Sequence, residues 1–359
     1  MKSLVLIVIL GMLGFSVFSQ NGVNFENLTL KEALAKAKAE NKLVFVDCST
    51  TWCCSCKYMD KNVFPLEEAG TYFNARFISL HFDMDKKENE GLFPISLHAF
   101  PTFLIIRPDG SIQHKMIGGE KYLEPFIERV ERGANFKTSY DYLDKLYKKG
   151  KMDKMQLIDY KLALDEAGEK EKSREIAEKM QILLTEKDKM KKEYWPIMRR
   201  STWGSDDYRL VLQNIVILNK NVGRENVENY LVNVFANKLR FSKDSVEVLK
   251  GMKGDLLGLS LPGKELLDRK IELALAGAEH DIDKVIILTG GAVTEGKEMF
   301  WPVIETLNVV KKNTSKEEVE RLLVLENECM KMLPTPKYKE FVENYFKELR
   351  FLFDHENGK

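Results

Sequence analysis

Two hydrophobic patterns divide the chain. Up to about residue 135, short apolar runs typical of buried strands alternate with segments of helical period. The predicted strands are "LVFVDC" (43–48), "RFISLHF" (76–82), "TFLIIR" (102–107) and, beyond the turn at Asp109-Gly110, the hairpin partner "SIQHKMIG" (111–118). From residue 138 onward helical periods dominate and strand signals all but disappear. The pattern therefore predicts a sheet-containing region followed by a helical one.

Helices are predicted between and after these strands. They span about residues 29–40, 53–62, 65–74 and 121–132. Thr29 and Glu32 have the spacing of a capping box at the start of the first helix, and Ser315 and Glu318 repeat it in the helical region. The predicted fold class is an α/β domain, with a central mixed sheet flanked by helices, followed by an all-α domain.

The first nineteen residues predict a signal peptide. Lys2 precedes a mainly apolar run from Leu4 to Phe18, and Ser19 offers a small residue for cleavage before Gln20. The run is shorter than the roughly 20 residues that span a bilayer, so we expect no membrane span after cleavage. We expect export to the periplasm or the extracellular space, a first domain over 22–135 and a helical domain over 136–359.

The helical domain shows helix pairs of uneven length. It lacks the recurring residues of a tetratricopeptide unit, and a helical-repeat-like array remains an open interpretation.

The overall charge of the chain is balanced, with 55 basic and 55 acidic residues. The summed field therefore gives no general attraction for nucleic acid or anionic lipid, and partners must be recognised locally. The sequence does not indicate an oligomeric state.

The five cysteines point to a chemical site. Four lie within residues 48–56 and the fifth is Cys329, which is a poor framework for structural disulfides. Cys53 falls at a predicted strand-to-helix junction, where the helix N-terminus stabilises a thiolate. Cys56 lies one turn later and can resolve a mixed disulfide by attacking Cys53. This spacing predicts a two-electron thiol-disulfide exchange site.

The other cysteines have simpler interpretations. Cys48 and Cys329 are expected to fill the core. Cys54 is interpreted as a bystander or auxiliary thiol, although Cys53, Cys54 and Cys56 together could hold Cu(I). A zinc site is not expected, because the histidines are scattered singly along the chain.

Three segments carry a resemblance to a known family. Residues 46–57, "VDCSTTWCCSCK", resemble the active-site segment of the thioredoxin family. Residues 99–110, "AFPTFLIIRPDG", look like its second signature, and Gly118-Gly119 matches the glycine near the end of its last strand. The resemblance covers about residues 25–135 and is strongest to exported bacterial proteins described as disulfide-isomerase-like or thiol:disulfide interchange proteins.

The resemblance implies further site residues. Asp47 would be the buried carboxylate that assists proton transfer from Cys56, and Trp52 would shield and position the loop. Pro101 would lie against Cys53, with a cis bond that keeps the backbone of Phe100 open to an extended substrate. The strand alignment also suggests that Ser79 replaces a lysine that accompanies the buried aspartate in some members.

The expected function is thiol-disulfide exchange with protein substrates. The redox-active disulfide is the only cofactor expected, and a redox partner would reset it. The two residues between the site cysteines are Cys54 and Ser55. They match neither the residues usual in reducing members of the family nor those usual in oxidising members, so they do not assign the direction of electron flow. A reductase or interchange type is favoured, with isomerase or oxidase as the alternative. Alternatives of another class are Cu(I) handling and a binding module built on the helical domain.

Overall fold

The computed structural model describes residues 22–241 and 245–355. The predicted signal peptide at residues 1–19 lies outside them. The chain divides into two compact units, the first reaching Asp188 and the second beginning at Lys189. No helix among the described residues is both long and apolar enough to cross a bilayer.

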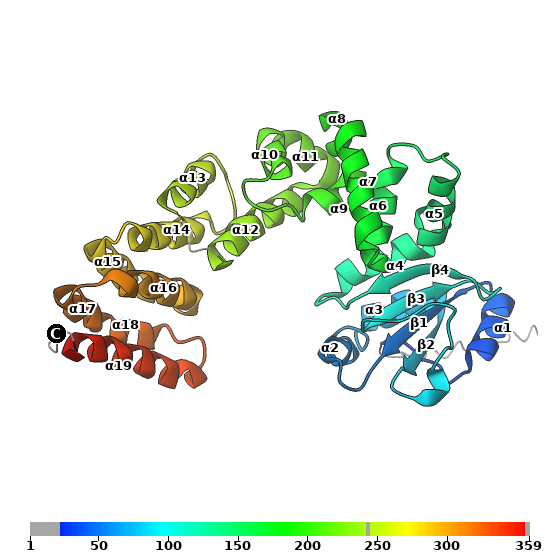
Figure 1. Ribbon diagram of the computed structural model, residues 1–359, viewed down its shortest axis with the longest axis horizontal. Helices are drawn as coiled ribbons and strands as arrows, with labels where there is room; N and C mark the ends of the chain where they lie inside the picture. Colours follow the sequence, from blue (N-terminus) through cyan, green and yellow to red (C-terminus); the bar gives the residue numbers. More distant parts are fainter. Residues whose placement is uncertain (1–21, 242–244, 356–359) are drawn as a thin grey trace, which may run out of the picture. The chain divides into compact units, whose positions relative to one another are not determined.

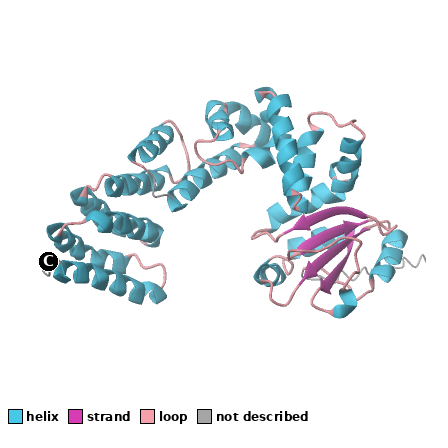
Figure 2. Cartoon of the chain, viewed as in Figure 1, coloured by secondary structure: helices cyan, strands magenta, loops and turns pink. Residues whose placement is uncertain are grey.

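A four-stranded mixed sheet forms the centre of the first unit (Figures 1 and 2). Its strands are β1 (Leu43–Ser49), β2 (Phe77–Asp83), β3 (Thr102–Ile106) and β4 (Ile112–Ile117), in the order β2-β1-β3-β4. β1 pairs in parallel with β2, whereas β1/β3 and β3/β4 are antiparallel. All four predicted strands and the mixed sheet are confirmed, with ends shifted by about one residue.

Helices cover both faces of this sheet. α2 (Cys54–Asn62), α3 (Glu67–Arg76) and α4 (Leu123–Ala134) pack on one face around Phe45, Phe103 and Phe126. α1 (Leu30–Glu40) and the segment that follows β2 cover the other face, around Val44, Val46 and Leu104. The predicted capping box of Thr29 and Glu32 is confirmed at the start of α1. The alternation of side chains along β1 explains this two-sided burial.

Further helices complete the first unit. They are α5 (Tyr140–Lys148), α6 (Gln156–Ala167), α7 (Lys170–Leu183) and the short α8 (Glu186–Lys189), which crosses the unit boundary. α5 and α6 pack against β4, and α7 packs on α6. The compact unit thus extends past residue 135, where the family-like elements end, and the predicted domain boundary there stays a prediction.

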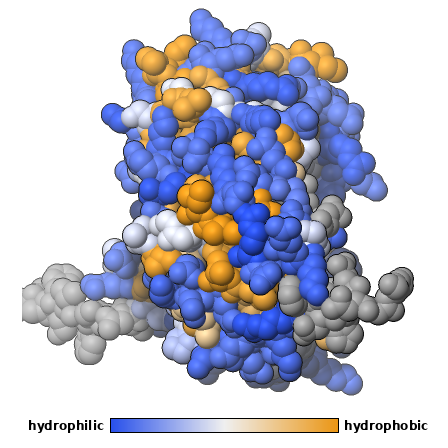
Figure 3. Space-filling model, turned by 90° about the vertical axis from the view of Figure 1, so that its left-hand side faces the viewer, coloured by the Kyte–Doolittle hydropathy of each residue, from blue (hydrophilic) through white to orange (hydrophobic). Residues whose placement is uncertain are grey.

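The second unit is built from helices. They are α9 (Trp195–Met198), α10 (Asp206–Gln213), α11 (Ile215–Val222), α12 (Arg224–Phe241), α13 (Val246–Leu257), α14 (Lys264–Ala278), α15 (Ile282–Ala292), α16 (Lys297–Val310), α17 (Lys316–Leu322), α18 (Glu326–Lys331) and α19 (Lys339–His355). The largely helical character is confirmed, as is the capping box of Ser315 and Glu318. The helices from α14 to α19 share a core that includes Phe300 and Phe346. The face drawn in Figure 3 is mainly hydrophilic with interspersed hydrophobic patches.

Candidate active site

Cys53 and Cys56 form a disulfide at the junction between β1 and α2. Cys53 is the N-cap residue of α2, and its Sγ accepts a hydrogen bond of 3.0 Å from the backbone N–H of Cys56. An N–H that points at this sulfur stabilises negative charge on it. Cys53 and Cys56 are only 5% and 2% exposed, so the pair lies just below the surface.

The remaining cysteines differ sharply in exposure. Cys54 is exposed beside the disulfide on the first turn of α2. Cys48 lies buried on the opposite side of β1 from Phe45, and burial raises the pKa of its thiol. Burial likewise raises the pKa of Cys329 to about 12. The expected core positions of Cys48 and Cys329 are confirmed, because both side chains are fully buried.

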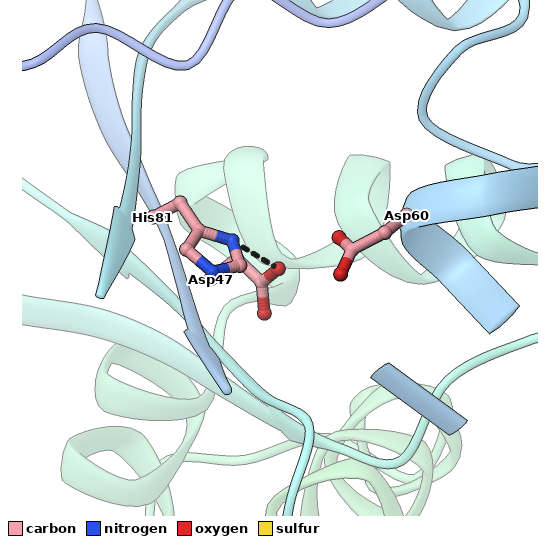
Figure 4. Close-up of side chains that lie close together, drawn as sticks. All are labelled: Asp47, Asp60 and His81. Atoms are coloured by element: carbon pink, nitrogen blue, oxygen red, sulfur yellow. Dashed lines mark hydrogen bonds and ion pairs between the residues drawn. The ribbon is translucent and has the colours of Figure 1, made fainter. Parts of the chain in front are cut away.

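Asp47 lies on β1, six residues before Cys53, with its side chain buried. Its Oδ2 is 3.2 Å from Nδ1 of His81 (Figure 4). Nε2 of His81 is 2.9 Å from the hydroxyl of Ser49. The strand register places Asp47 directly opposite His81, whereas Ser79 is opposite Phe45. The strand neighbour of Asp47 is thus His81, and the suggestion that Ser79 replaces a lysine of some family members stays a prediction.

Burial and the histidine act in opposite directions on Asp47. Burial raises the pKa of the Asp47 carboxyl group, and the hydrogen bond and charge of His81 only partly counteract this rise. The same hydrogen bond raises the pKa of His81. Asp47 Oδ1 has no hydrogen-bond partner in the described part of the chain. A buried carboxyl group with a raised pKa and a free oxygen is suited to accept a proton near neutral pH.

A second carboxylate approaches this pair. Asp60 on α2 faces Asp47 and His81, and one ligand atom from each residue lies within 4.8 Å of the other two (Figure 4). Burial raises the pKa of Asp60. Two carboxylates and an imidazole are ligands that a divalent cation accepts, but both nitrogens of His81 already face Asp47 and Ser49. Among the described residues this is the one group with ligand-like geometry, and it contains no cysteine.

Asp85 organises the loop before the disulfide. Its Oδ2 accepts hydrogen bonds from the backbone N–H and the hydroxyl of Thr51, at 2.8 and 2.7 Å. Its Oδ1 accepts one of 3.1 Å from Nε1 of Trp52. These bonds lower the pKa of Asp85. The ring of Trp52 is 66% exposed and meets Phe100 edge-on at 5.9 Å.

The segments that flank β3 and β4 form another part of this region. The peptide bond between Phe100 and Pro101 is cis, and the carbonyl of Pro101 accepts a 2.8 Å hydrogen bond from Gly118 N–H. Arg129 on α4 donates to the carbonyl of Gly118 at 2.8 Å. Gly119 has no room for a side chain, because an added Cβ would lie 2.8 Å from Oγ of Ser55 on α2. The expected contact between Pro101 and Cys53 stays a prediction.

The site thus combines three groups that can take part in thiol-disulfide exchange. One thiol lies at a helix N-terminus, a second lies one turn later, and a buried acid precedes both on β1. The sequence analysis identified these three residues but missed His81, Asp60 and Asp85. Aligning the starts of the two parallel strands at Leu43 and Phe77 would have paired Asp47 with His81.

Comparisons with known proteins concern the part of the chain that contains this site. Residues 24–108 match the family model described as "Thioredoxin-like". A "putative disulphide-isomerase" from Bacteroides thetaiotaomicron is 36% identical, covering 32% of this chain and 95% of its own, with a TM-score of 0.29. The oxidised C-terminal domain of DsbD from Neisseria meningitidis is 26% identical, covering 31% and 98%, with a TM-score of 0.27. No curated protein matches the chain.

The family match and the mixed sheet concern the same part of the molecule. The matched residues include β1, β2, β3 and the cysteine pair, and the helices of the second unit lie outside the match. Through its N-terminal region, this chain belongs to the thioredoxin-like family.

Proposed function

We propose that this protein is an exported thiol-disulfide oxidoreductase that exchanges disulfides with protein substrates through Cys53 and Cys56. The observation that carries the proposal is the Cys53 sulfur at the start of α2, which accepts the N–H of Cys56. This geometry favours thiolate at Cys53 in the reduced protein. The predicted signal peptide supports export to the periplasm or outside the cell, since such a leader directs secretion.

The reaction begins with the reduced pair. The Cys53 thiolate attacks one sulfur of a substrate disulfide, which forms a mixed disulfide and releases the other substrate sulfur as a thiolate. Asp47 accepts the thiol proton of Cys56. Cys56 then attacks the Cys53 sulfur, the mixed disulfide breaks, and the second substrate thiol leaves. Two electrons pass to the substrate, and the Cys53–Cys56 disulfide remains for reduction by a dithiol redox partner.

Substrate access supports a protein substrate. The ring of Trp52, the residue before Cys53, contacts the ring of Phe100, and Pro101 immediately precedes β3. The side chain of Trp52 is largely exposed, so its ring is available to an incoming polypeptide. An extended segment bound there would bring its disulfide to Cys53. We favour reductase or interchange activity, with isomerase or oxidase activity as the alternative.

Trapping the mixed disulfide tests the proposal. Cys56→Ser removes the resolving thiol, so Cys53 should remain bonded to a disulfide protein such as insulin, as a conjugate seen by mass spectrometry. Cys54→Ser is the matched control, and it should neither form this stable conjugate nor slow insulin reduction. If Cys56→Ser forms its conjugate through Cys54, the assigned nucleophile is wrong.

Exposed Cys54 supports the Cu(I)-handling alternative. Reduction of the disulfide would leave three thiols within four positions, and soft thiolates select Cu(I). Reduced protein that retains Cu(I) after desalting, and loses it on Cys54→Ser, would favour this function. Retention that is absent, or unchanged by Cys54→Ser, would favour exchange chemistry alone.

A further inference from the structure

Three side chains from separate elements meet beside the disulfide, and we call them the Asp60 cluster. Asp47 lies on β1, His81 lies on β2 and Asp60 lies on α2. One carboxylate oxygen of each aspartate and one ring nitrogen of His81 lie within 4.8 Å of one another. Figure 4 shows the Asp47 carboxylate on the side of the imidazole that faces Asp60. The proposed exchange reaction uses Asp47 and gives Asp60 no role.

The two carboxylates of the cluster have oxygens without partners. Asp47 is only 1% exposed, yet its Oδ1 has no hydrogen-bond partner in the described part of the chain. Within the same residues, no hydrogen bond or ion pair holds the carboxylate of Asp60. A buried carboxylate oxygen costs free energy unless a donor or a cation reaches it. The cluster therefore offers acceptor oxygens to a positively charged ligand.

Negative charge dominates the surroundings of the imidazole. Three carboxylates, those of Asp47, Asp60 and Asp83, act electrostatically on this ring. Asp60 also repels Asp47, and among the described residues the charge of His81 alone opposes that repulsion. Carboxylates that face each other disfavour each other's ionised forms. A divalent cation between them would remove this repulsion, because it would be the largest charge at the site.

Ser49 holds the imidazole from its other side. Its hydroxyl oxygen lies 2.9 Å from Nε2 of His81. In the tautomer with a proton on Nε2, this nitrogen donates to Ser49 and the lone pair of Nδ1 faces Asp47, 3.2 Å away. A histidine that binds a metal usually donates its other ring N–H in this way. A cation can therefore replace the proton that joins Nδ1 to Oδ2 of Asp47.

The ligand set selects among cations. Two carboxylates and one imidazole suit Zn²⁺, which often takes three protein ligands and a water, whereas Mg²⁺ and Ca²⁺ bind six or more ligands, mainly oxygens. Ligands of a tetrahedral zinc ion lie about 3.4 Å apart, so the atoms of the cluster must approach by at most about 1.4 Å. Asp60 and His81 are exposed, which allows side-chain rotation and access of the water. The scattered histidines do not exclude this set, because it uses one imidazole.

We infer that Asp47, Asp60 and His81 bind a divalent transition-metal cation of the Zn²⁺ type. The cation would release the shared proton to solvent and bind the Asp47 carboxylate. Because the proposed exchange reaction needs Asp47 to accept a proton from Cys56, the cation-bound protein should exchange disulfides slowly. This regulatory consequence rests on the proposed function, whereas cation binding itself does not.

Isothermal titration calorimetry of the oxidised full-length protein with zinc chloride tests binding. The disulfide keeps Cys53 and Cys56 from binding zinc, and we expect one equivalent to bind at the cluster. Asp60→Asn and His81→Gln each remove a ligand and should weaken binding at least about tenfold, since loss of a hydrogen bond behind a ligand already costs about that much. Ser49→Ala should weaken it about tenfold for that second reason. Excess Mg²⁺ should not displace the zinc.

Control variants separate the cluster from other zinc ligands and from misfolding. Glu68→Gln removes an exposed carboxylate from α3 and should leave the affinity unchanged. Cys54→Ser removes the exposed thiol beside the disulfide and should also leave it unchanged. Asp60 and Glu68 are both exposed, so their amide variants should keep the native circular dichroism spectrum and melting temperature.

A single-turnover assay tests the effect on exchange. Reduced protein is mixed with a fluorogenic disulfide peptide at a Zn²⁺ concentration between the dissociation constants of the native protein and Asp60→Asn. Each variant is compared with its own zinc-free rate. Zinc should slow the native protein and Glu68→Gln, and slow Asp60→Asn much less. Zinc held only by the reduced thiols would slow all three alike and would contradict the regulatory consequence.

Three calorimetric results would overturn the inference. They are no zinc binding by the oxidised protein, unchanged affinity of the Asp60→Asn/His81→Gln double variant, and loss of binding on Cys54→Ser. Displacement of zinc by an equal concentration of Mg²⁺ would contradict the assigned type of cation. A protein that binds zinc at the cluster but does not exchange disulfides would refute the proposed function and leave the binding site intact.

Discussion

The first unit contains two carboxylate–histidine pairs that play different roles. Asp47 pairs with His81 beside the disulfide, and Glu166 on α6 pairs with His114 on β4 at 2.9 Å. Both carboxylates are buried. The residue types are nearly the same, so their neighbours must account for the difference.

In the Glu166 pair, each carboxylate oxygen and each ring nitrogen of His114 has a hydrogen-bond partner. The backbone N–H of Tyr140 donates to Nδ1 of His114 at 3.0 Å, which leaves Nε2 to donate to Glu166. The other oxygen of Glu166 accepts from Arg132 Nε at 3.1 Å. Burial acts to raise the pKa of Glu166, but His114 and the charge of Arg132 together hold it below its usual range. This network joins α6 to the sheet and leaves no oxygen for proton transfer.

Within the described ranges, the Asp47 carboxylate has neither a second cation nor a second hydrogen-bond donor beside it. One oxygen of Asp47 has no partner in the described part of the chain, and the pKa of the group is raised. The comparison teaches that the number of donors around a buried carboxylate decides its role. A buried carboxylate whose two oxygens both accept hydrogen bonds has a structural role, and one with an unpartnered oxygen can accept a proton.

Glu166→Gln should have the largest effect on stability. It leaves His114 without its charged partner and leaves Arg132 with only the more distant carboxylate of Asp159, and we expect a loss of about 3 kcal/mol in the free energy of unfolding. Because the pKa of Glu166 is lowered on folding, its contribution is present above the pKa of an unfolded glutamate and is lost as the pH falls through the folded value.

Denaturant titrations between acidic and neutral pH measure this effect. Glu169→Gln, at a half-exposed glutamate near Lys115, is the matched control and should change stability little. The exchange rate of folded Glu166→Gln protein should be normal. A slowed exchange rate with normal stability would contradict the structural role.

Asp47→Asn should have the largest effect on exchange. Loss of the proton acceptor should slow release of the mixed disulfide roughly 10²-fold, and stopped-flow insulin reduction would measure this rate. Stability should change in the opposite direction to that of Glu166→Gln. A raised pKa gives stability that is lost as the pH rises through the folded value, so the variant should gain stability relative to the native protein at alkaline pH. If Asp47→Asn is less stable than the native protein at alkaline pH, this interpretation is contradicted.

His81→Gln should move the pH dependence of exchange. The hydrogen bond and charge of His81 lower the pKa of Asp47, so their loss should raise it further. The rising limb of the resolution rate should therefore lie at higher pH. Below that limb the rate should fall up to about tenfold for each pH unit by which the limb moves. Rates measured from pH 5 to 9 test this, and an unmoved limb would show that His81 does not act through Asp47.

Asp85→Asn should have the smallest effect. Its hydrogen bonds to Thr51 and Trp52 lie at the surface, where each is worth about 1 kcal/mol or less. We expect KM for insulin to rise a few-fold with little change in stability, because the Trp52 loop becomes less ordered. Glu88→Gln, at an exposed glutamate in the same polar segment, is the control and should be neutral.

The strands and the thiol pair could be predicted because their signals are local. Apolar runs of five to seven residues identify buried strands, and two cysteines one helical turn apart identify an exchange site. The residue beside Asp47 required the register of β1 and β2. A strand start at Arg76 instead of Phe77 would place Leu80 opposite Asp47, because a shift of one residue moves every side chain to the other face.

Contacts between distant elements could not be predicted. His114 and Glu166 are 52 residues apart, and only the packing of α6 on β4 brings them together. Helical periodicity predicts which face of a helix is apolar and does not say which helix will pack there.

The most direct test of the exchange site is the reduction potential of the purified protein. Equilibration in dithiothreitol or glutathione buffers, with trapped thiols located by mass spectrometry, should give one two-electron step confined to Cys53 and Cys56. A value near about −270 mV would support a reductase, and one above about −200 mV would support an isomerase or oxidase. Failure of Cys53 and Cys56 to pair at any potential would contradict the account.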